Sequence, residues 1–268
     1  MKRNSAFWGF VFILFGGLMM LNTFGWLHFN IWRVFWPSMV ILLGIWVLWQ
    51  AQMGGAALET ENIAIPLDGA HQARVVIHHG AGELRLRSGA SPHNLLEGDF
   101  DGGVEQQIRR RDENLDVSLK VPHQGIPFVF FPGIFNSGSR IAWDMRLNPN
   151  IPLALELHTG ANDAHLDLSM VQVTELEIQT GASTTQVDLP AQAEFIRVKV
   201  SAGAASVVLN VPAGVAARVD VDGGLLGVDV DLARFPKAGN VYQSADYETA
   251  AQRVEININA GVGSISVQ

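Results

Sequence analysis

The sequence repeats one short motif: LALELHTGANDAHLDLS (153–169), LEIQTGASTTQVDLP (176–190), FIRVKVSAGAASVVLNVP (195–212) and ARVDVDGGLLGVDVD (217–231). Each copy has an alternating apolar–polar run, a turn of small residues and a second alternating run. A glycine marks the turn of each copy, at steps of 21, 22 and 20 residues: Gly160, Gly181, Gly203 and Gly223. A motif that recurs at such a regular spacing predicts a stacked repeat architecture.

Alternation with a period of two residues is typical of a β-strand that is buried on one face. In the first copy Leu155 and Leu157 point to one face and Glu156 to the other. The same pattern predicts inner residues as far as Val228 and Leu232 in the last copy. One rung cannot bury its inner face alone, so the rungs must stack. We therefore predict an all-β, solenoid-like repeat domain.

The charge of the chain is unevenly distributed. The net charge is −8 over 268 residues, and the first 58 residues contribute +3, from Lys2, Arg3 and Arg33. The remainder is therefore acidic, which excludes it as a candidate for binding nucleic acid, because phosphates require a basic surface. The chain has no cysteine, which excludes disulfides and thiolate metal sites and leaves the redox compartment open.

Residues 1–50 contain two apolar runs, 7–27 and 31–49, joined by a short polar turn. Each run is long enough to cross a bilayer, so we predict a transmembrane helical hairpin. A cleaved signal peptide followed by one anchor is the alternative, but no small-residue cleavage pattern separates the runs. The predicted membrane-interface residues are aromatic or able to extend to the headgroups: Trp8, Trp26, Trp32, Arg33, Trp36 and Trp49.

This N-terminal pattern, FWGFVFILFGGLMMLNTFGWLHFNIWRVFWPSMVILLGIWVL (7–48), resembles the LiaI/LiaF-like transmembrane region. The β repeats resemble the LiaF-like and toast-rack, adhesin-like β domains that accompany it. The resemblance implies a regulator of the cell-envelope stress response in the bacterial inner membrane, typically acting on a sensor histidine kinase. It implies neither an enzyme activity nor a cofactor.

The rest of the chain is organised around the repeats. Residues 51–62 read as a linker, and 63–268 as the β-solenoid-like domain. Further segments resemble rungs or strands: 74–87, 106–120, 139–147 and a closing unit at 254–267. Two segments lack this pattern. Residues 88–103 read as a loop, and 233–252 as a polar excursion that contains a short helix or caps an end of the stack.

The sequence carries no catalytic motif and no phosphate-binding loop. Stacking could bring four histidines together, but no ligand spacing requires a metal: His78, His79, His158 and His165. The stretch 223–229 resembles a calcium-binding turn that occurs only once, so its neighbouring aspartates are expected to form an acidic outer face: Asp220, Asp222, Asp229 and Asp231. We therefore predict no metal site.

One segment, GIPFVFFPGIF (125–135), is too irregular for a strand. Its aromatic residues are predicted either to cap the solenoid or to contact the bilayer or a membrane partner: Phe128, Phe130, Phe131 and Phe135. An exposed apolar patch usually marks a contact surface.

Taken together, the sequence predicts a multi-pass membrane protein that acts by contact and not as an enzyme. The candidate partners are the lipid bilayer, a sensor kinase and further copies of the chain. A self-associating scaffold or adhesin-like binding module is the alternative, and a carbohydrate-active β-helix enzyme is disfavoured because no paired carboxylates stand out. Lys2 and Arg3 place the N-terminus inside by the positive-inside tendency, so two spans predict a cytoplasmic β domain.

Overall fold

The computed structural model describes residues 36–37, 40–41, 59–122, 141–239 and 241–268. One compact unit, formed by 57–126 and 139–268, contains all the strands of the described chain. The helical hairpin expected at 1–50 lies outside the described residues, apart from Trp36, Pro37, Val40 and Ile41, which are helical.

The described part of the β unit contains thirteen strands, connected in one sheet system. Their bounds are β1 Thr60–Pro66, β2 Gln72–Ser88, β3 Asn94–Asp101, β4 Glu105–Arg111, β5 Asn114–Lys120, β6 Ala142–Leu147, β7 Leu153–Asp167, β8 Val173–Asp188, β9 Phe195–Asn210, β10 Ala216–Val230, β11 Lys237–Ala238, β12 Val241–Gln243 and β13 Arg253–Val267. The all-β, solenoid-like architecture predicted from the repeats is confirmed.

Each long strand folds back on itself near its middle, and this bend makes one rung. Residues 168–172 alone connect the end of β7 to the start of β8, and they span about 20 Å at most. A straight strand of this length would separate those ends by about 50 Å. The buried positions also change from odd to even numbers, from Leu155 and Leu157 to Ala164 and Leu166. We call the two halves the first arm and the return arm, and the bend between them the arch.

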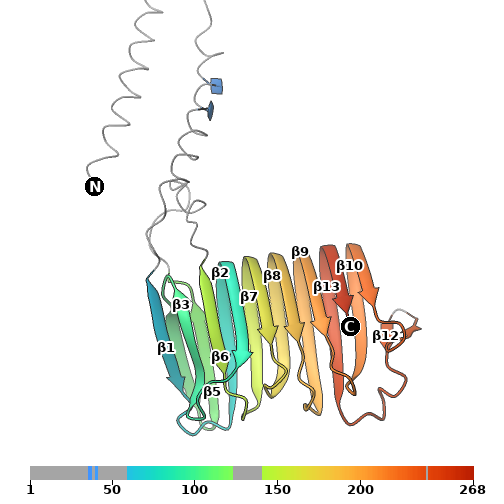
Figure 1. Ribbon diagram of the computed structural model, residues 1–268, viewed down its shortest axis with the longest axis horizontal. Helices are drawn as coiled ribbons and strands as arrows, with labels where there is room; N and C mark the ends of the chain where they lie inside the picture. Colours follow the sequence, from blue (N-terminus) through green and yellow to red (C-terminus); the bar gives the residue numbers. More distant parts are fainter. Residues whose placement is uncertain (1–35, 38–39, 42–58, 123–140, 240) are drawn as a thin grey trace, which may run out of the picture. The chain divides into compact units, whose positions relative to one another are not determined.

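The rungs stack in parallel in the order β2, β7, β8, β9, β13, β10 (Figure 1). The register is nearly unbroken, so equivalent residues of neighbouring rungs form rows through the stack. The expectation that 254–267 closes the stack is wrong, because β13 lies between β9 and β10. The long segment 231–252 allows this, since it carries the chain past β10 and back into the stack.

The stack begins with a rung made from two separate strands. The first arm of β2 pairs with β5, and its return arm pairs with β6. Strands β3 and β1 then extend the return-arm sheet, and β4 forms a hairpin with β5. Two expectations need correction: residues 88–103 contain strand β3, and β1 begins at Thr60, inside the segment 51–62 expected as a linker.

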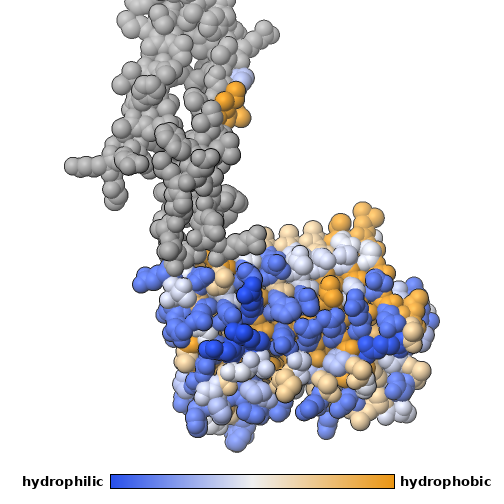
Figure 2. Space-filling view, in the orientation of Figure 1, coloured by the Kyte–Doolittle hydropathy of each residue, from blue (hydrophilic) through white to orange (hydrophobic). Residues whose placement is uncertain are grey.

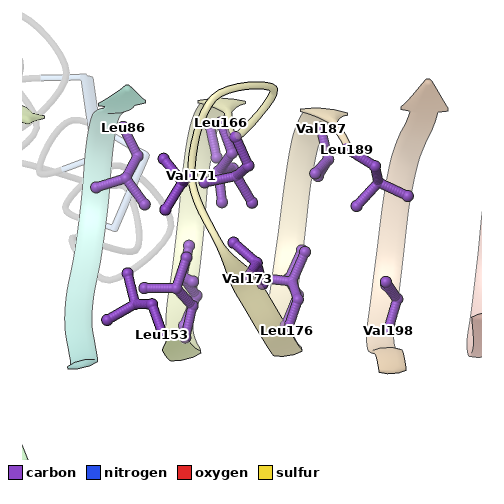
Figure 3. Packing of buried hydrophobic residues seen from close by; sticks show 14 of the residues in the cluster. Leu86, Leu153, Leu166, Val171, Val173, Leu176, Val187, Leu189 and Val198 are labelled. Carbon is purple, nitrogen blue, oxygen red and sulfur yellow. The ribbon is translucent and has the colours of Figure 1, made fainter. Parts of the chain in front are cut away.

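The core lies between the first arms and the return arms. Figure 3 shows its side chains repeated from rung to rung, among them Leu153, Leu176 and Val198. The inner positions predicted from alternation are fully buried in the middle rungs. In β10 the prediction is wrong for two residues, because Val228 is 38% exposed and Leu232 is 60% exposed. Strand β10 is the last rung, so no further rung covers the core there.

A row of glycines forms the arches, where neighbouring backbones come very close. A Cβ on Gly160 would lie 2.4 Å from the carbonyl oxygen of Gly80, a distance that real Cβ atoms do not adopt. The row continues through the other rungs, with Cβ-to-oxygen distances of 2.7 to 2.9 Å: Gly181, Gly203, Gly261 and Gly224. In β10 the glycine of this row is Gly224 and not the expected Gly223, which lies in register with Ala260.

Three polar side chains are buried beside the arches, on successive rungs. His79 of β2, Asn162 of β7 and Thr180 of β8 have side-chain polar atoms without a hydrogen-bond partner among the described residues. His79 packs edge-on against Trp143, with ring centroids 5.0 Å apart. Burial lowers the pKa of His79 to about 4, and the backbone of Ile141 opposes this shift only in part. The imidazole is therefore held neutral in the core.

Substituting Gly160→Ala tests the close contact at the arch. The new methyl group would overlap the Gly80 carbonyl oxygen, so we expect a loss of roughly 1 to 3 kcal/mol in the free energy of unfolding. Urea denaturation of the detergent-solubilised protein, followed by the circular dichroism of the β-sheet, measures this loss. Gly80→Ala is the matched control, since no described atom lies within 4 Å of its Cβ position. Equal stability of the two variants would contradict the contact.

The second prediction concerns the loss of stability that acid causes through His79. Because the unfolded histidine takes up a proton near pH 6.5 and folded His79 only near pH 4, acidification favours the unfolded chain. Stability should fall by roughly 3 kcal/mol between these two pH values through this residue alone. The same denaturation experiment at several pH values tests it. The variant His79→Leu should lose much less stability over this range, and an unchanged pH dependence would refute the assignment.

Candidate functional site

The two outer faces of the stack differ in chemistry. The face formed by the first arms, here the first-arm face, is rich in charged and histidine side chains: Arg74, His78, Glu156, His158, Glu175, Glu177, Arg197, Lys199, Arg218, Asp220, Asp222 and Glu255. The return-arm face of β8, β9 and β13 carries no charge in its two central rows: Thr184, Gln186, Ser206, Val208, Ser264 and Ser266. Each arm contributes its outward residues to only one face. The bend therefore separates the charged outward residues from the uncharged ones.

One row of the first-arm face alternates in charge across the stack. Starting from Asp116 of β5, the register places these residues next to one another in order: Asp116, Arg74, Ala154, Glu175, Arg197, Glu255 and Arg218. Neighbouring strands lie about 4.8 Å apart, so each charge lies beside one of opposite sign, except next to Ala154. The row is therefore an ordered charge pattern that also stabilises the stacking.

The next row joins neighbouring rungs through carboxylates. Glu156 accepts from Arg74 at 2.5 Å and contacts Nε2 of His158 at 2.7 Å. The hydrogen bond from Arg74, followed by that from His158, lowers the pKa of Glu156. In the same way Glu177 accepts from Gln179 and Lys199, and both bonds lower its pKa. The carboxylates are therefore ionised and held in fixed positions.

Two of the four histidines come together on this face. His78 and His158 stack with ring centroids 4.6 Å apart and an angle of 10° between their planes. Burial is the main cause that lowers the pKa of His78, followed by the charges of His158 and Lys120. The stacked pair is thus a planar platform beside the charged rows.

The other two histidines lie elsewhere. His79 is in the core, and His165 lies on the return-arm face, 3.9 Å from Asp188. Among the described residues, no group of three or more His, Asp or Glu side chains has a geometry that could hold a metal ion.

The aspartates near the end of the stack do not form one cluster. Asp220 and Asp222 belong to the first arm of β10. Asp229 lies on its return arm, and Asp231 directly follows the end of the strand. All four are exposed. They therefore contribute to the acidic outer surface on two different faces.

Most predicted contact residues of the membrane region and of the phenylalanine segment lie outside the described residues: Trp8, Trp26, Trp32, Arg33, Trp49, Phe128, Phe130, Phe131 and Phe135. Trp36 is described, is helical and is 57% exposed. In the part of the chain that the structure describes, no helix is long and apolar enough to cross a membrane.

Sequence reasoning did not find the exposed apolar end of the stack, which Figure 2 shows near β10. Leu225 is 77% exposed and Val262 of the neighbouring rung is 52% exposed. A signal was present in the row that follows the arch glycines. In the first four rungs this row is alanine: Ala81, Ala161, Ala182 and Ala204. In the last two rungs it changes to Val262 and Leu225. Large apolar residues at this outward position make the surface of the last two rungs more hydrophobic than that of the first four.

A known structure shares the fold. A candidate cell adhesion protein from Clostridium sporogenes is 22% identical, with a TM-score of 0.69 over 78% of this chain and 98% of its own. A candidate adhesin from Bacteroides fragilis is 8% identical, with a TM-score of 0.32 over 80% of this chain and 98% of its own. The first likeness shows the fold alone. No curated protein matches the chain.

Two family profiles cover most of the chain. The LiaI-LiaF-like transmembrane region matches residues 6–48. The N-terminal domain of toast_rack, DUF2154, matches residues 54–210, which is more than half of the chain. The β rungs and the N-terminal pattern therefore agree with these profiles, and the chain belongs to the LiaI/LiaF-like toast-rack family of membrane proteins.

Proposed function

We propose that this protein is a non-enzymatic regulator of the cell-envelope stress response, anchored in the bacterial inner membrane, and that it acts by contact on a sensor histidine kinase. Its family supports membrane anchoring and a protein-contact module. The LiaF-like character of the chain supports a kinase as the partner.

The observation that carries the proposal is the first-arm face. Its charges lie in fixed rows on a parallel sheet, and two of its carboxylates, Glu156 and Glu177, are held by hydrogen bonds. Complementary charge patterns give specificity and fast association more than raw affinity. These are the properties that reversible control of a partner requires.

A second candidate is an adhesin-like or scaffolding role, and the return-arm face favours it. Hydroxyl and amide side chains dominate that face over β8, β9 and β13, and Ser206 and Ser264 are hydrogen-bonded at 2.9 Å. The related Clostridium structure is described as a candidate cell adhesion protein. An uncharged polar face of this kind suits extended hydrogen bonding to a flat partner.

We also propose that the interface tryptophans with Arg33, and the four phenylalanines of 125–135, contact the bilayer or a membrane-embedded partner. The topology supports this arrangement. Lys120 and Ala142 flank the phenylalanine segment, and both lie beside the arch of β2. The chain enters the domain at Thr60, which lies at the same end of the return-arm sheet. Thr60, Lys120 and Ala142 thus all lie at the arch end of the domain.

The kinase proposal predicts a face-specific crosslink. A photoreactive benzoyl-phenylalanine placed at Gln179 in living cells should crosslink to the kinase, because this exposed residue lies on the first-arm face. The matched control is Gln186, which is exposed on the return-arm face of the same strand. Mass spectrometry of the adducts identifies the partner.

A kinase adduct at Gln186 and none at Gln179 would reject the first-arm face as the contact. A probe at Phe130 extends the experiment, since adducts with lipid or with transmembrane peptides are expected there. Adducts with soluble proteins alone would contradict the membrane-contact proposal.

The proposed kinase contact also requires the β domain to be cytoplasmic, which the residues Lys2 and Arg3 favour. Because the chain has no native cysteine, the variant Ala245→Cys introduces a single exposed thiol. We expect an impermeant maleimide to leave this thiol unlabelled in intact cells and to label it after the membrane is opened. Labelling in intact cells would place the domain outside and rule out contact with a cytoplasmic kinase domain.

A further inference from the structure

The arches of the stacked rungs follow one another in a line along one end of the domain. The register places the residue after each arch glycine beside its equivalent on the next rung. All the residues of this row are exposed: Ala81, Ala161, Ala182, Ala204, Val262 and Leu225. Because neighbouring rungs lie about 4.8 Å apart, the row is about 24 Å long from β2 to β10. We call this line of exposed residues the arch ridge.

The arch ridge and its surroundings carry no charge. No carboxylate, ammonium or guanidinium group occurs in the residues that form the arches: 79–82, 159–162, 180–183, 202–205, 260–263 and 223–226. His79 is the one titratable residue among them, and its pKa of about 4 keeps it neutral in the core. The outward residues that flank the ridge on β8, β9 and β13 are also uncharged: Gln179, Ser201, Asn259, Thr184, Ser206 and Ser264. A contact along these rungs therefore removes no ionised group from water.

The arch ridge becomes strongly apolar toward β10. Val262 is 52% exposed and Leu225 is 77% exposed, the largest exposed fraction among the large hydrophobic side chains of the described chain. Figure 2 shows hydrophobic surface along this end of the domain, most extensive toward β10. Neither side chain contributes to the core, so their exposure to water is unfavourable unless a partner covers them. An exposed apolar patch of this kind marks a contact surface.

The chain from the membrane region enters the domain at the same end as the arch ridge. The match to the transmembrane region ends at residue 48, and β1 begins at Thr60. The residues between them, 49–59, span about 40 Å at most. Thr60 pairs with Asp101 at the arch end of the return-arm sheet, whereas the base of each rung lies about 20 Å from its arch. The length of this connection thus favours the bilayer as the surface that meets the ridge.

We propose that the arch ridge lies on the surface of the lipid bilayer, with the side chains of Leu225 and Val262 inserted at the boundary between headgroups and acyl chains. Two apolar side chains suffice for this contact because the anchor holds the domain at a high local concentration beside the membrane. The stack then runs along the membrane plane, and both outer faces stay free for protein partners. The proposal depends on the membrane anchoring of the family and not on the proposed kinase contact.

Quenching by labelled lipid tests the contact. The full chain is reconstituted in phosphatidylcholine vesicles in which some headgroups of both leaflets carry a nitroxide, a short-range quencher. With no native cysteine, Ala182→Cys places a single fluorophore on the arch ridge, and Ala191→Cys places it on an exposed residue at the base end as the matched control. The fluorophore at 182 should lose most of its emission and the one at 191 little. Equal quenching at both positions, or none at 182, would overturn the proposal.

A second variant separates the ridge contact from the effect of the tether. Leu225→Asp combined with Val262→Asn should lower the quenching at 182 to the level seen at 191, with unchanged circular dichroism because both residues are exposed. Met170→Asp is the control, since it removes a 67% exposed apolar side chain at the base end and should change nothing. Undiminished quenching in the double variant would show that the tether alone holds this end near the lipid and would overturn the proposal. The vesicles contain no kinase, so neither result bears on the kinase contact.

Discussion

The close approach of backbones at the arches is the constraint on which the rest of the structure depends. A Cβ at Gly181 would lie 2.9 Å from the carbonyl oxygen of Gly160, and the same contact recurs from rung to rung. Only glycine permits this spacing, so the strands can bend while they remain at hydrogen-bonding distance. The bend switches the buried positions between odd-numbered and even-numbered residues, so that each strand contributes to two opposed sheets with a shared core.

The same bend separates the surface chemistry and fixes its order. Because the register is kept through the stack, a side chain on one rung has a fixed neighbour on the next, and opposite charges such as Glu175 and Arg197 lie side by side. A slip by one residue would turn Arg197 into the core and is therefore strongly disfavoured. The charge pattern of the first-arm face thus also maintains the alignment of the rungs.

The rungs were predictable from the sequence because each strand has one buried face and one solvent-exposed face. Strand β3 was not, because a glycine fills the inward position 98 between Leu96 and Phe100 and Leu95 is also buried, so the alternation of apolar and polar residues is obscured. The position of β13 was not predictable either, since local pattern contains no information on which rung is the neighbour. For the same reason the pairing of His78 with His158 required the structure, as these residues are adjacent only because β2 stacks on β7.

The two ends of each rung are not equally robust. The connections at the base bury Leu168 and Val171 and bond their backbones, whereas the arch end buries His79 without a hydrogen-bond partner among the described residues. An unpaired buried polar group costs stability, and for a histidine the cost increases as the pH falls. Thr60 and Lys120 lie at this same end, where the chain enters the domain and where the phenylalanine segment begins. The end of the domain at which the chain enters is therefore also the end that holds this buried histidine.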